Sequence, residues 1–139
     1  MMMAAVHHIA YLVKSIAKSE PAFTALGYKR ERDVFYDAER KTNFLFLSGN
    51  GMRVELVEPQ EDSDIYPLLK KYKNEIYHVC YCVNDLDAAV QELQENGFLL
   101  FRDKQRARAI SDTAQVVFLT HARMGIVELL QEDGDGVHA

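Results

Sequence analysis

The chain has 139 residues, of which 48% are hydrophobic and 27% charged, a composition typical of one globular domain. Its formal net charge of −5 disfavours non-specific binding to nucleic acid, which depends on positive charge. No apolar run approaches the roughly 20 residues of a membrane span, and the first residues lack the basic and apolar regions of a secretory signal, so we expect neither nucleic-acid nor membrane partners.

The first half of the chain predicts one helix among four strands. Ser15 is a suitable N-cap for this helix and Gly27 a suitable C-terminal stop. Pro21 falls inside the helix and is expected to kink it or to end its first turn. The sequence Ser-Gly-Asn-Gly at 48–51 predicts a hairpin turn between the last two strands. The apolar positions of the helix are Ile16, Phe23 and Leu26. The strands are expected at about 6–13, 28–36, 42–47 and 52–58.

A linker at 59–75, with a short amphipathic helix at about 65–72, leads to a second set of the same elements. Asp85 is suited to cap a helix over 86–95, and Gly97 to end it. The apolar face of this helix consists of Leu86, Ala89, Val90 and Leu93. We expect strands at 76–83, 98–101, 114–119 and 126–130, a basic loop at 102–113, and a frayed tail at 132–139.

The two halves repeat each other in spacing as well as in element order. The interval from His8 to Gly27 (27 − 8 = 19) equals the interval from His78 to Gly97 (97 − 78 = 19). Each copy later reaches a glutamate between apolar neighbours, Glu55 after 47 residues (55 − 8) and Glu128 after 50 (128 − 78). The sequence therefore predicts a single α+β domain over 1–139. It consists of two tandem βαβββ modules at about 6–58 and 76–131.

One histidine and one glutamate per module suggest a metal site with four ligands. A single inward-facing histidine or glutamate on a strand is usually a hydrogen-bonded core residue, but a buried lone carboxylate is costly. Two imidazoles and two carboxylates suit zinc, nickel, cobalt, iron or manganese, and an octahedral ion would keep two open positions. Strand alternation places His7 on the face opposite His8, so His7 is not expected to be a ligand. The four candidate ligands are His8, Glu55, His78 and Glu128.

Cys80 and Cys82 share the strand face of His78. Two cysteines at this spacing on an extended strand cannot form an ordinary disulfide bond, which favours a reducing, cytoplasmic environment. We expect both to line the core or the wall of the site, and not to act as ligands.

Over about 6–131 the sequence resembles the vicinal oxygen chelate superfamily, which has the glyoxalase/bleomycin resistance/dioxygenase fold. Within it, the sequence is most similar to bacterial glyoxalase I (lactoylglutathione lyase) and to methylmalonyl-CoA epimerase. The resemblance implies a curved mixed sheet around a divalent metal, a homodimer, and the same four ligands. The motifs that carry it are His-His-Ile-Ala-Tyr at 7–11, Val-Glu-Leu-Val-Glu-Pro at 54–59, Tyr-His-Val at 77–79 and Ile-Val-Glu-Leu-Leu at 126–130.

Both enzyme families remove a proton next to a metal-polarised carbonyl group. The resemblance to glyoxalase I, which is slightly the nearer of the two, implies that Glu128 is the base. The resemblance to the epimerase implies that Glu39 is the base instead. The alternative is that Glu39 is an ordinary solvent-exposed acid in a loop, with no catalytic role. Candidates to bind an anionic part of a thioester or hemithioacetal substrate, such as CoA phosphates or glutathione carboxylates, are Arg102, Lys104, Arg106 and Arg108; the alternative is a solvated basic loop.

The sequence also departs from the epimerase pattern. Thr120-His121-Ala122-Arg123 follows Phe118-Leu119, where the epimerases carry His-Pro-Lys, and Ala107–Ser111 replaces a glycine-rich loop. Two other kinds of protein share the fold. Non-catalytic resistance proteins of the superfamily lack the four-ligand set, and ring-cleaving dioxygenases use three protein ligands, so the fourth candidate ligand argues against both. The expected cofactor is a nickel, cobalt, zinc or manganese ion.

Overall fold

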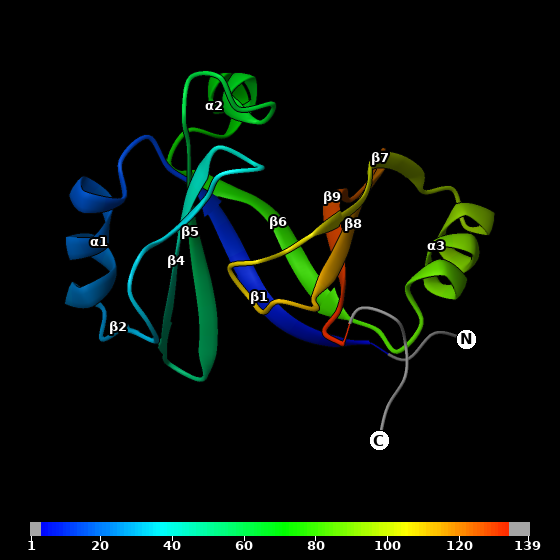
Figure 1. Ribbon diagram of the computed structural model, residues 1–139, viewed down its shortest axis with the longest axis horizontal. Coiled ribbons are helices and arrows are strands. Elements are labelled where there is room, and N and C mark those ends of the chain that lie inside the picture. Colours follow the sequence, from blue (N-terminus) through cyan, green and yellow to red (C-terminus); the bar gives the residue numbers. More distant parts are fainter. Residues whose placement is uncertain (1–3, 134–139) are drawn as a thin grey trace. The chain divides into compact units, whose positions relative to one another are not determined.

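The computed structural model describes residues 4–133 and has an α+β fold (Figure 1). The chain divides into two compact units. The N-terminal unit is His8–Tyr77, and the C-terminal unit combines the described residues 4–7 with 78–133. Within the described residues, no helix is both long and apolar enough to span a membrane. The predicted tail at 132–139 lies outside the described residues from 134 onward.

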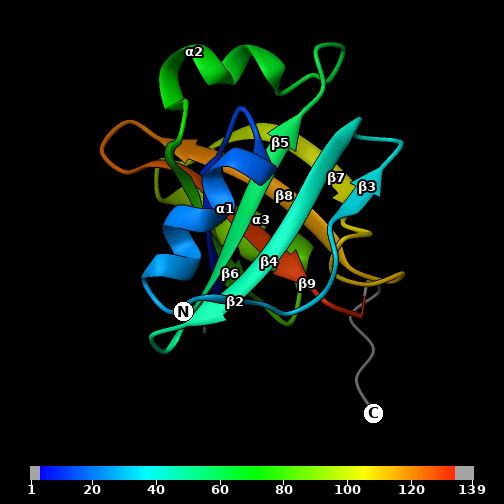
Figure 2. The same cartoon turned by 90° about the vertical axis from the view of Figure 1, so that its left-hand side faces the viewer.

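The N-terminal unit has one mixed sheet with α1 packed against one face (Figure 2). Within it, β1 pairs parallel with β5, and β4 pairs antiparallel with β5, β2 and β3. A 3-10 turn and the short helix α2 follow the sheet. The elements are β1 (Ala5–Leu12), α1 (Ile16–Ala25), β2 (Lys29–Arg30), β3 (Phe35–Asp37), β4 (Thr42–Gly49), β5 (Met52–Pro59), the 3-10 turn (Tyr66–Leu68) and α2 (Leu69–Tyr72).

Strand alternation divides the side chains of this sheet between two different environments. The face toward α1 carries a buried apolar cluster of Val13, Ile16, Leu45, Leu47, Val54 and Leu56. On the other face, Ala10 of β1 and Phe46 of β4 both lie opposite Glu55 of β5. His8, two residues before Ala10, shares that face. His8 and Glu55 therefore lie on the face that points away from α1.

The C-terminal unit repeats this plan. In it, β6 pairs parallel with β9, β9 antiparallel with β8, and β8 antiparallel with β7. Asp85 accepts a hydrogen bond from Ala88 N and caps α3, as predicted. The elements are β6 (Glu75–Cys82), α3 (Leu86–Glu95), β7 (Leu99–Arg106), β8 (Gln115–His121) and β9 (Gly125–Gln131).

The two faces of this second sheet also differ. Toward α3 lies an apolar cluster that includes Val83, Leu86, Ala89, Val117, Leu119, Val127 and Leu129. On the other face, Cys80 of β6 and Phe118 of β8 both lie opposite Glu128 of β9. The apolar cluster on this face includes Ala107, Ala114, Val116 and Leu130. The two glutamates thus occupy matching places in the two units.

The structure corrects the sequence prediction in the charged stretch of the first module. The strand expected over 28–36 is broken into β2 and β3, because the chain bends away after Glu31, whose N–H donates to Phe46 O at 2.9 Å. Arg30 donates to both carboxylate oxygens of Glu20 at 2.7 and 2.8 Å and thereby lowers the pKa of Glu20. Leu26 is 70% exposed and so lies off the apolar face of α1, which runs unbroken through Pro21.

The basic loop expected over 102–113 is also corrected, because β7 continues through Arg106. The charged side chains of this segment lie on a strand with an exposed face, where water solvates them and sheet hydrogen bonds still form. Lys104 forms an ion pair with Asp87 at 2.9 Å. Only residues 107–114 form the connection to β8. The high charge of residues 102–106 therefore wrongly indicated a loop where the structure has a strand.

Gly49, where β4 meets the hairpin turn, is a position where a side chain does not fit. An added Cβ would lie 2.9 Å from Gly27 O and 3.0 Å from Tyr28 Cα, which are backbone atoms that cannot rotate away. We expect Gly49→Ala to lower the free energy of unfolding by about 1–3 kcal/mol, measured by urea denaturation. Ser48, the exposed neighbouring residue, provides the control. Ser48→Ala should change the free energy of unfolding by less than about 0.5 kcal/mol. Equal stability of the two variants would contradict the crowding at Gly49.

Candidate metal centre

The N-terminal unit contains a buried histidine–glutamate pair. The parallel pairing of β1 with β5 places His8 and Glu55 on one face, and His8 Nε2 lies 3.2 Å from Glu55 Oε1. Their side chains are 0% and 7% exposed. Removing both groups from water is costly, so the pair needs a compensating interaction beyond general packing.

The C-terminal unit contains an equivalent pair. The parallel pairing of β6 with β9 places His78 beside Glu128, with Nε2 and Oε1 2.9 Å apart. The two side chains are 1% and 4% exposed. In each unit the histidine and the glutamate named as candidate ligands therefore lie side by side.

An aromatic ring orients the histidine in each pair. The Phe46 ring lies edge-on to His8, with centroids 5.3 Å apart and an interplanar angle of 75°. The Phe118 ring lies edge-on to His78, at 5.1 Å and 74°. Each phenylalanine is also directly opposite the glutamate of its pair on the neighbouring strand. This packing restricts the imidazole rings and so preorganises the nitrogen atoms.

The chemistry of the four side chains fits a divalent ion. Two ligand atoms each about 2.1 Å from one ion, and at right angles to each other, are about 3.0 Å apart. The observed nitrogen–oxygen separations of 3.2 and 2.9 Å are close to this value. Imidazole nitrogen and carboxylate oxygen also suit the ions of intermediate hardness expected from the sequence.

Glu39 lies in a different kind of environment. It is exposed, in the turn between β3 and β4. The buried carboxylate of Asp37 accepts hydrogen bonds from Glu39 N at 3.0 Å and from Arg40 N at 3.1 Å. Ser63 Oγ donates to Arg40 O at 2.9 Å, which holds the turn from its other side. The backbone beneath Glu39 is therefore fixed, while the side chain faces solvent.

The three arginines proposed from sequence do not share one loop. Arg102 is half-buried on β7, and Arg106 ends that strand and donates to Asp112 O at 3.0 Å. Arg108 is exposed in the connection to β8. Arg102 is opposite Phe118 on the neighbouring strand, and its Cζ lies over the Phe101 ring, 5.7 Å from the centroid.

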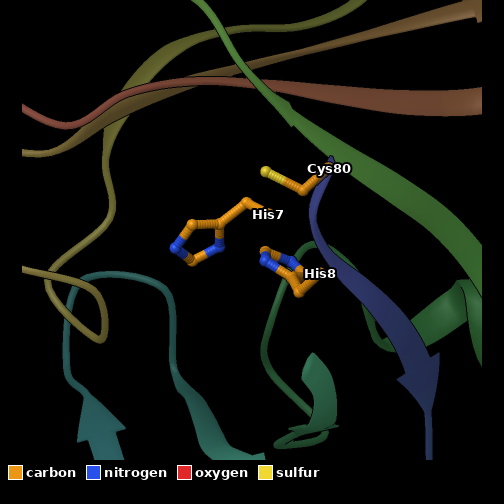
Figure 3. Close-up of side chains that lie close together, drawn as sticks. All are labelled: His7, His8 and Cys80. Atoms are coloured by element: carbon orange, nitrogen blue, oxygen red, sulfur yellow. The ribbon is translucent and has the colours of Figure 1, made fainter. Parts of the chain in front are cut away.

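His7 is the residue of β1 that precedes His8. A potential ligand atom of His7 lies within 4.8 Å of one of Cys80, and Figure 3 shows these side chains with His8, the next residue of β1. His7 Nε2 is also 3.6 Å from Glu132 Oε1, an oxygen to which Cys82 Sγ donates at 3.8 Å. Since His78, Cys80 and Cys82 alternate onto one face of β6, His7 turns toward that face. Burial alternates regularly along β1, so that His7 is half-buried and His8 is buried.

The sequence interpretation missed Arg32. Its Cζ lies over the Phe46 ring, 5.7 Å from the centroid, and its side chain is exposed. The repeat could have revealed it, because Arg32 precedes Arg102 by the interval that separates His8 from His78 (102 − 32 = 78 − 8 = 70).

Comparison with known proteins supports the assignment of the fold. A model of the family described as "Glyoxalase/Bleomycin resistance protein/Dioxygenase superfamily" matches residues 7–118. A hypothetical protein from Bacillus halodurans C-125 is 25% identical, with a TM-score of 0.79 over 93% of this chain and 94% of that chain. Methylmalonyl-CoA epimerase from Mycobacterium tuberculosis is 22% identical, with a TM-score of 0.73 over 91% and 87%. A Streptomyces coelicolor methylmalonyl-CoA epimerase variant in complex with 2-nitronate-propionyl-CoA is 19% identical, with a TM-score of 0.74 over 95% and 99%. No curated protein matches the chain.

Proposed function

Since the chain belongs to the glyoxalase/bleomycin resistance protein/dioxygenase superfamily, we propose that it is a divalent-metal-dependent enzyme that removes a proton next to a carbonyl group. One observation carries the proposal: each of the two units holds a buried histidine–glutamate pair at the equivalent place. A purely structural role would not require the same costly pair twice.

In this proposal the two pairs serve one ion, with His8, Glu55, His78 and Glu128 as ligands. The donor set suits nickel, cobalt, zinc or manganese. A bound ion supplies Lewis acidity, which polarises a substrate carbonyl and makes the neighbouring C–H bond more acidic. The apolar residues on the face of Glu128 exclude water and strengthen electrostatic interactions there.

Glu128 is the base we favour. Its carboxylate is 2.9 Å from His78 and sits among apolar side chains, where a proton acceptor is poorly solvated and its position is restricted. The alternative base is Glu39, whose fixed backbone but exposed side chain suits an acid that must reach toward a substrate.

Two substrate classes fit this proton transfer. A hemithioacetal of glutathione would make the protein a glyoxalase I-like lyase, with Glu128 as base. An acyl-CoA thioester would make it an epimerase, and the structural neighbours named methylmalonyl-CoA epimerase favour this second candidate. In either case, the anionic part of the small-molecule substrate is proposed to be bound by Arg102, Arg106 and Arg108. The protein is proposed to act as a homodimer.

The test measures proton removal directly. Nickel- or cobalt-loaded protein is incubated in deuterium oxide with methylmalonyl-CoA, and proton NMR follows loss of the signal of the acidic C–H group. In parallel, absorbance follows thioester formation from the hemithioacetal of methylglyoxal and glutathione. We expect one of the two substrates to react, and a sample treated with chelator to be inactive. Failure of both substrates in a metal-replete sample would reject both candidate functions.

A further inference from the structure

The turn between β3 and β4 of the N-terminal unit carries an arginine that lies over an aromatic ring. This arginine is Arg40, whose Cζ is 4.8 Å from the centroid of the Phe44 ring. The turn and the strands around it belong to the same unit. We propose that Arg40 binds an anionic oxygen group of the substrate and thereby contributes to specificity; this rests on the proposed metal-dependent function.

The Phe44 ring lies on the face of the sheet that carries the histidine–glutamate pair of this unit. Phe46 is directly opposite Glu55 and shares its face, and Phe44, two residues earlier on β4, points to the same side. Leu45, between the two phenylalanines, packs in the cluster on the opposite face, toward α1. The Arg40 guanidinium therefore lies on the side of the sheet where the proposed chemistry takes place.

Buried side chains hold the backbone of Arg40 on both sides. Arg40 N donates to the Asp37 carboxylate at 3.1 Å. Arg40 O accepts hydrogen bonds from Thr42 Oγ1 at 2.8 Å and from Ser63 Oγ at 2.9 Å. These three polar side chains are only 2%, 0% and 6% exposed, in chain order, and burying such groups is costly unless they form hydrogen bonds. Their hydrogen bonds fix one turn and so preorganise the arginine that it carries.

The residue after Arg40 has a strained backbone. Lys41 has a φ of +52°, in the left-handed region that residues other than glycine and asparagine rarely adopt. Lys41 O accepts a hydrogen bond from Gln60 N at 2.9 Å, which helps to hold this conformation. Strained conformations persist only where the surrounding structure holds them, and they concentrate at active sites and ligand-binding segments. We interpret the strained turn as the support of a binding residue.

Arg40 also differs from neighbouring cations in its contacts. Lys41 forms an ion pair with Asp62 at 3.3 Å, and Arg30 donates to both carboxylate oxygens of Glu20. Among the residues that the structure describes, the Arg40 guanidinium lies over a ring and forms no ion pair. A guanidinium over a ring keeps N–H groups available to an anion, and its planar fork suits a carboxylate or a phosphate.

The inference can be tested with hydroxamates, which bind metal ions and can carry a second, different arm. Acetohydroxamate has a neutral methyl arm. The monohydroxamates of malonic, succinic and glutaric acid carry a carboxylate at increasing distance, and phosphonoacetohydroxamate carries a phosphonate. The visible spectrum of the cobalt-loaded protein reports binding of each probe. We expect at least one acidic probe to bind about ten-fold or more tightly than acetohydroxamate, because hydrogen bonds to charged groups exceed neutral ones by about that factor.

In Arg40→Gln this preference should fall by about ten-fold, while the dissociation constant of acetohydroxamate stays the same. The turn should keep its structure in this variant, because its hydrogen bonds use the backbone of Arg40. Lys41→Gln is the matched control: it removes the same charge from the next residue, which is paired with Asp62, and should keep the preference. Arg40→Lys keeps the charge but loses the planar fork, so it should keep only part of the preference.

The acidic arm that binds most tightly distinguishes a carboxylate from a phosphate group in the substrate. If acetohydroxamate perturbs the cobalt spectrum but no acidic probe binds more tightly, Arg40 does not select an anion, and the metal centre stands. The same conclusion follows if the preference survives in Arg40→Gln, or if Lys41→Gln loses it equally. If none of the probes perturbs the spectrum of the cobalt-loaded protein, the metal centre with open positions is wrong, and the inference falls with it.

Discussion

Replacing His78 with alanine is expected to remove nearly all bound metal from the protein. Loss of even an outer residue around a metal site weakens binding about 10–100-fold, and a direct ligand should contribute at least that much. Elemental analysis of protein purified in the presence of nickel or cobalt measures the metal bound per chain. The same loss is expected for His8→Ala, because His8 holds the matching place in the other unit.

The alanine variant also leaves Glu128 buried beside a cavity, which is expected to destabilise the fold by about 3–5 kcal/mol. His78→Gln therefore provides the sharper test, since its amide keeps a polar group beside Glu128 while its side chain is a poorer ligand. We expect this variant to fold and yet to lose the metal. His121→Ala, which changes a histidine outside both pairs, should retain the metal. Normal metal content in His78→Gln would reject the proposed ligand set.

Glu128→Gln is expected to slow proton removal by about 10²–10⁴-fold, the usual contribution of a general base. Glutamine has nearly the same shape as glutamate but cannot accept the proton. Because Glu128 is also a proposed ligand, the rate must be expressed per bound metal ion. Deuterium incorporation into the reacting substrate, combined with elemental analysis, gives that rate.

Glu55→Gln separates the two roles of Glu128. Glu55 occupies the matching place in the N-terminal unit and is proposed as a ligand only, so this variant should lose metal but keep most of its rate per bound ion. Glu39→Gln should retain both metal and rate if Glu128 is the base. A large loss of rate in Glu39→Gln with full metal content would instead make Glu39 the base and favour the epimerase.

Features fixed by a few neighbouring residues were predictable from sequence. Ser15 accepts a hydrogen bond from Lys18 N, as an N-cap does, and Gly27 and Gly97 adopt φ values of +98° and +90° at the helix ends. The turn after Gly49 has positive φ at both Asn50 and Gly51, as expected of a tight hairpin. The burial of Glu55 and Glu128 was predictable because each belongs to a strand with a clear apolar pattern, repeated at nearly the same interval.

Features that depend on contacts between distant segments could not be predicted. The length of β7 depends on pairing with β8, which the charged sequence after Phe101 does not indicate. The position of Arg32 over Phe46 likewise results from a break in strand pairing, so only the comparison of the two modules could have indicated it.

The pairing of β7 with β8 shifts between Leu100 and Arg102, and this bulge affects how the protein resists aggregation. β7 is the last strand in the order β6-β9-β8-β7, and its first residues, Leu99, Leu100 and Phe101, are 68%, 44% and 39% exposed. A straight, apolar strand at the end of a sheet would offer its backbone to a strand from another molecule. The pairing shifts along β7 and the alternating charges from Arg102 to Arg106 make this strand a poor template. The irregular pairing of β7 thus protects the exposed end of the sheet from joining other chains.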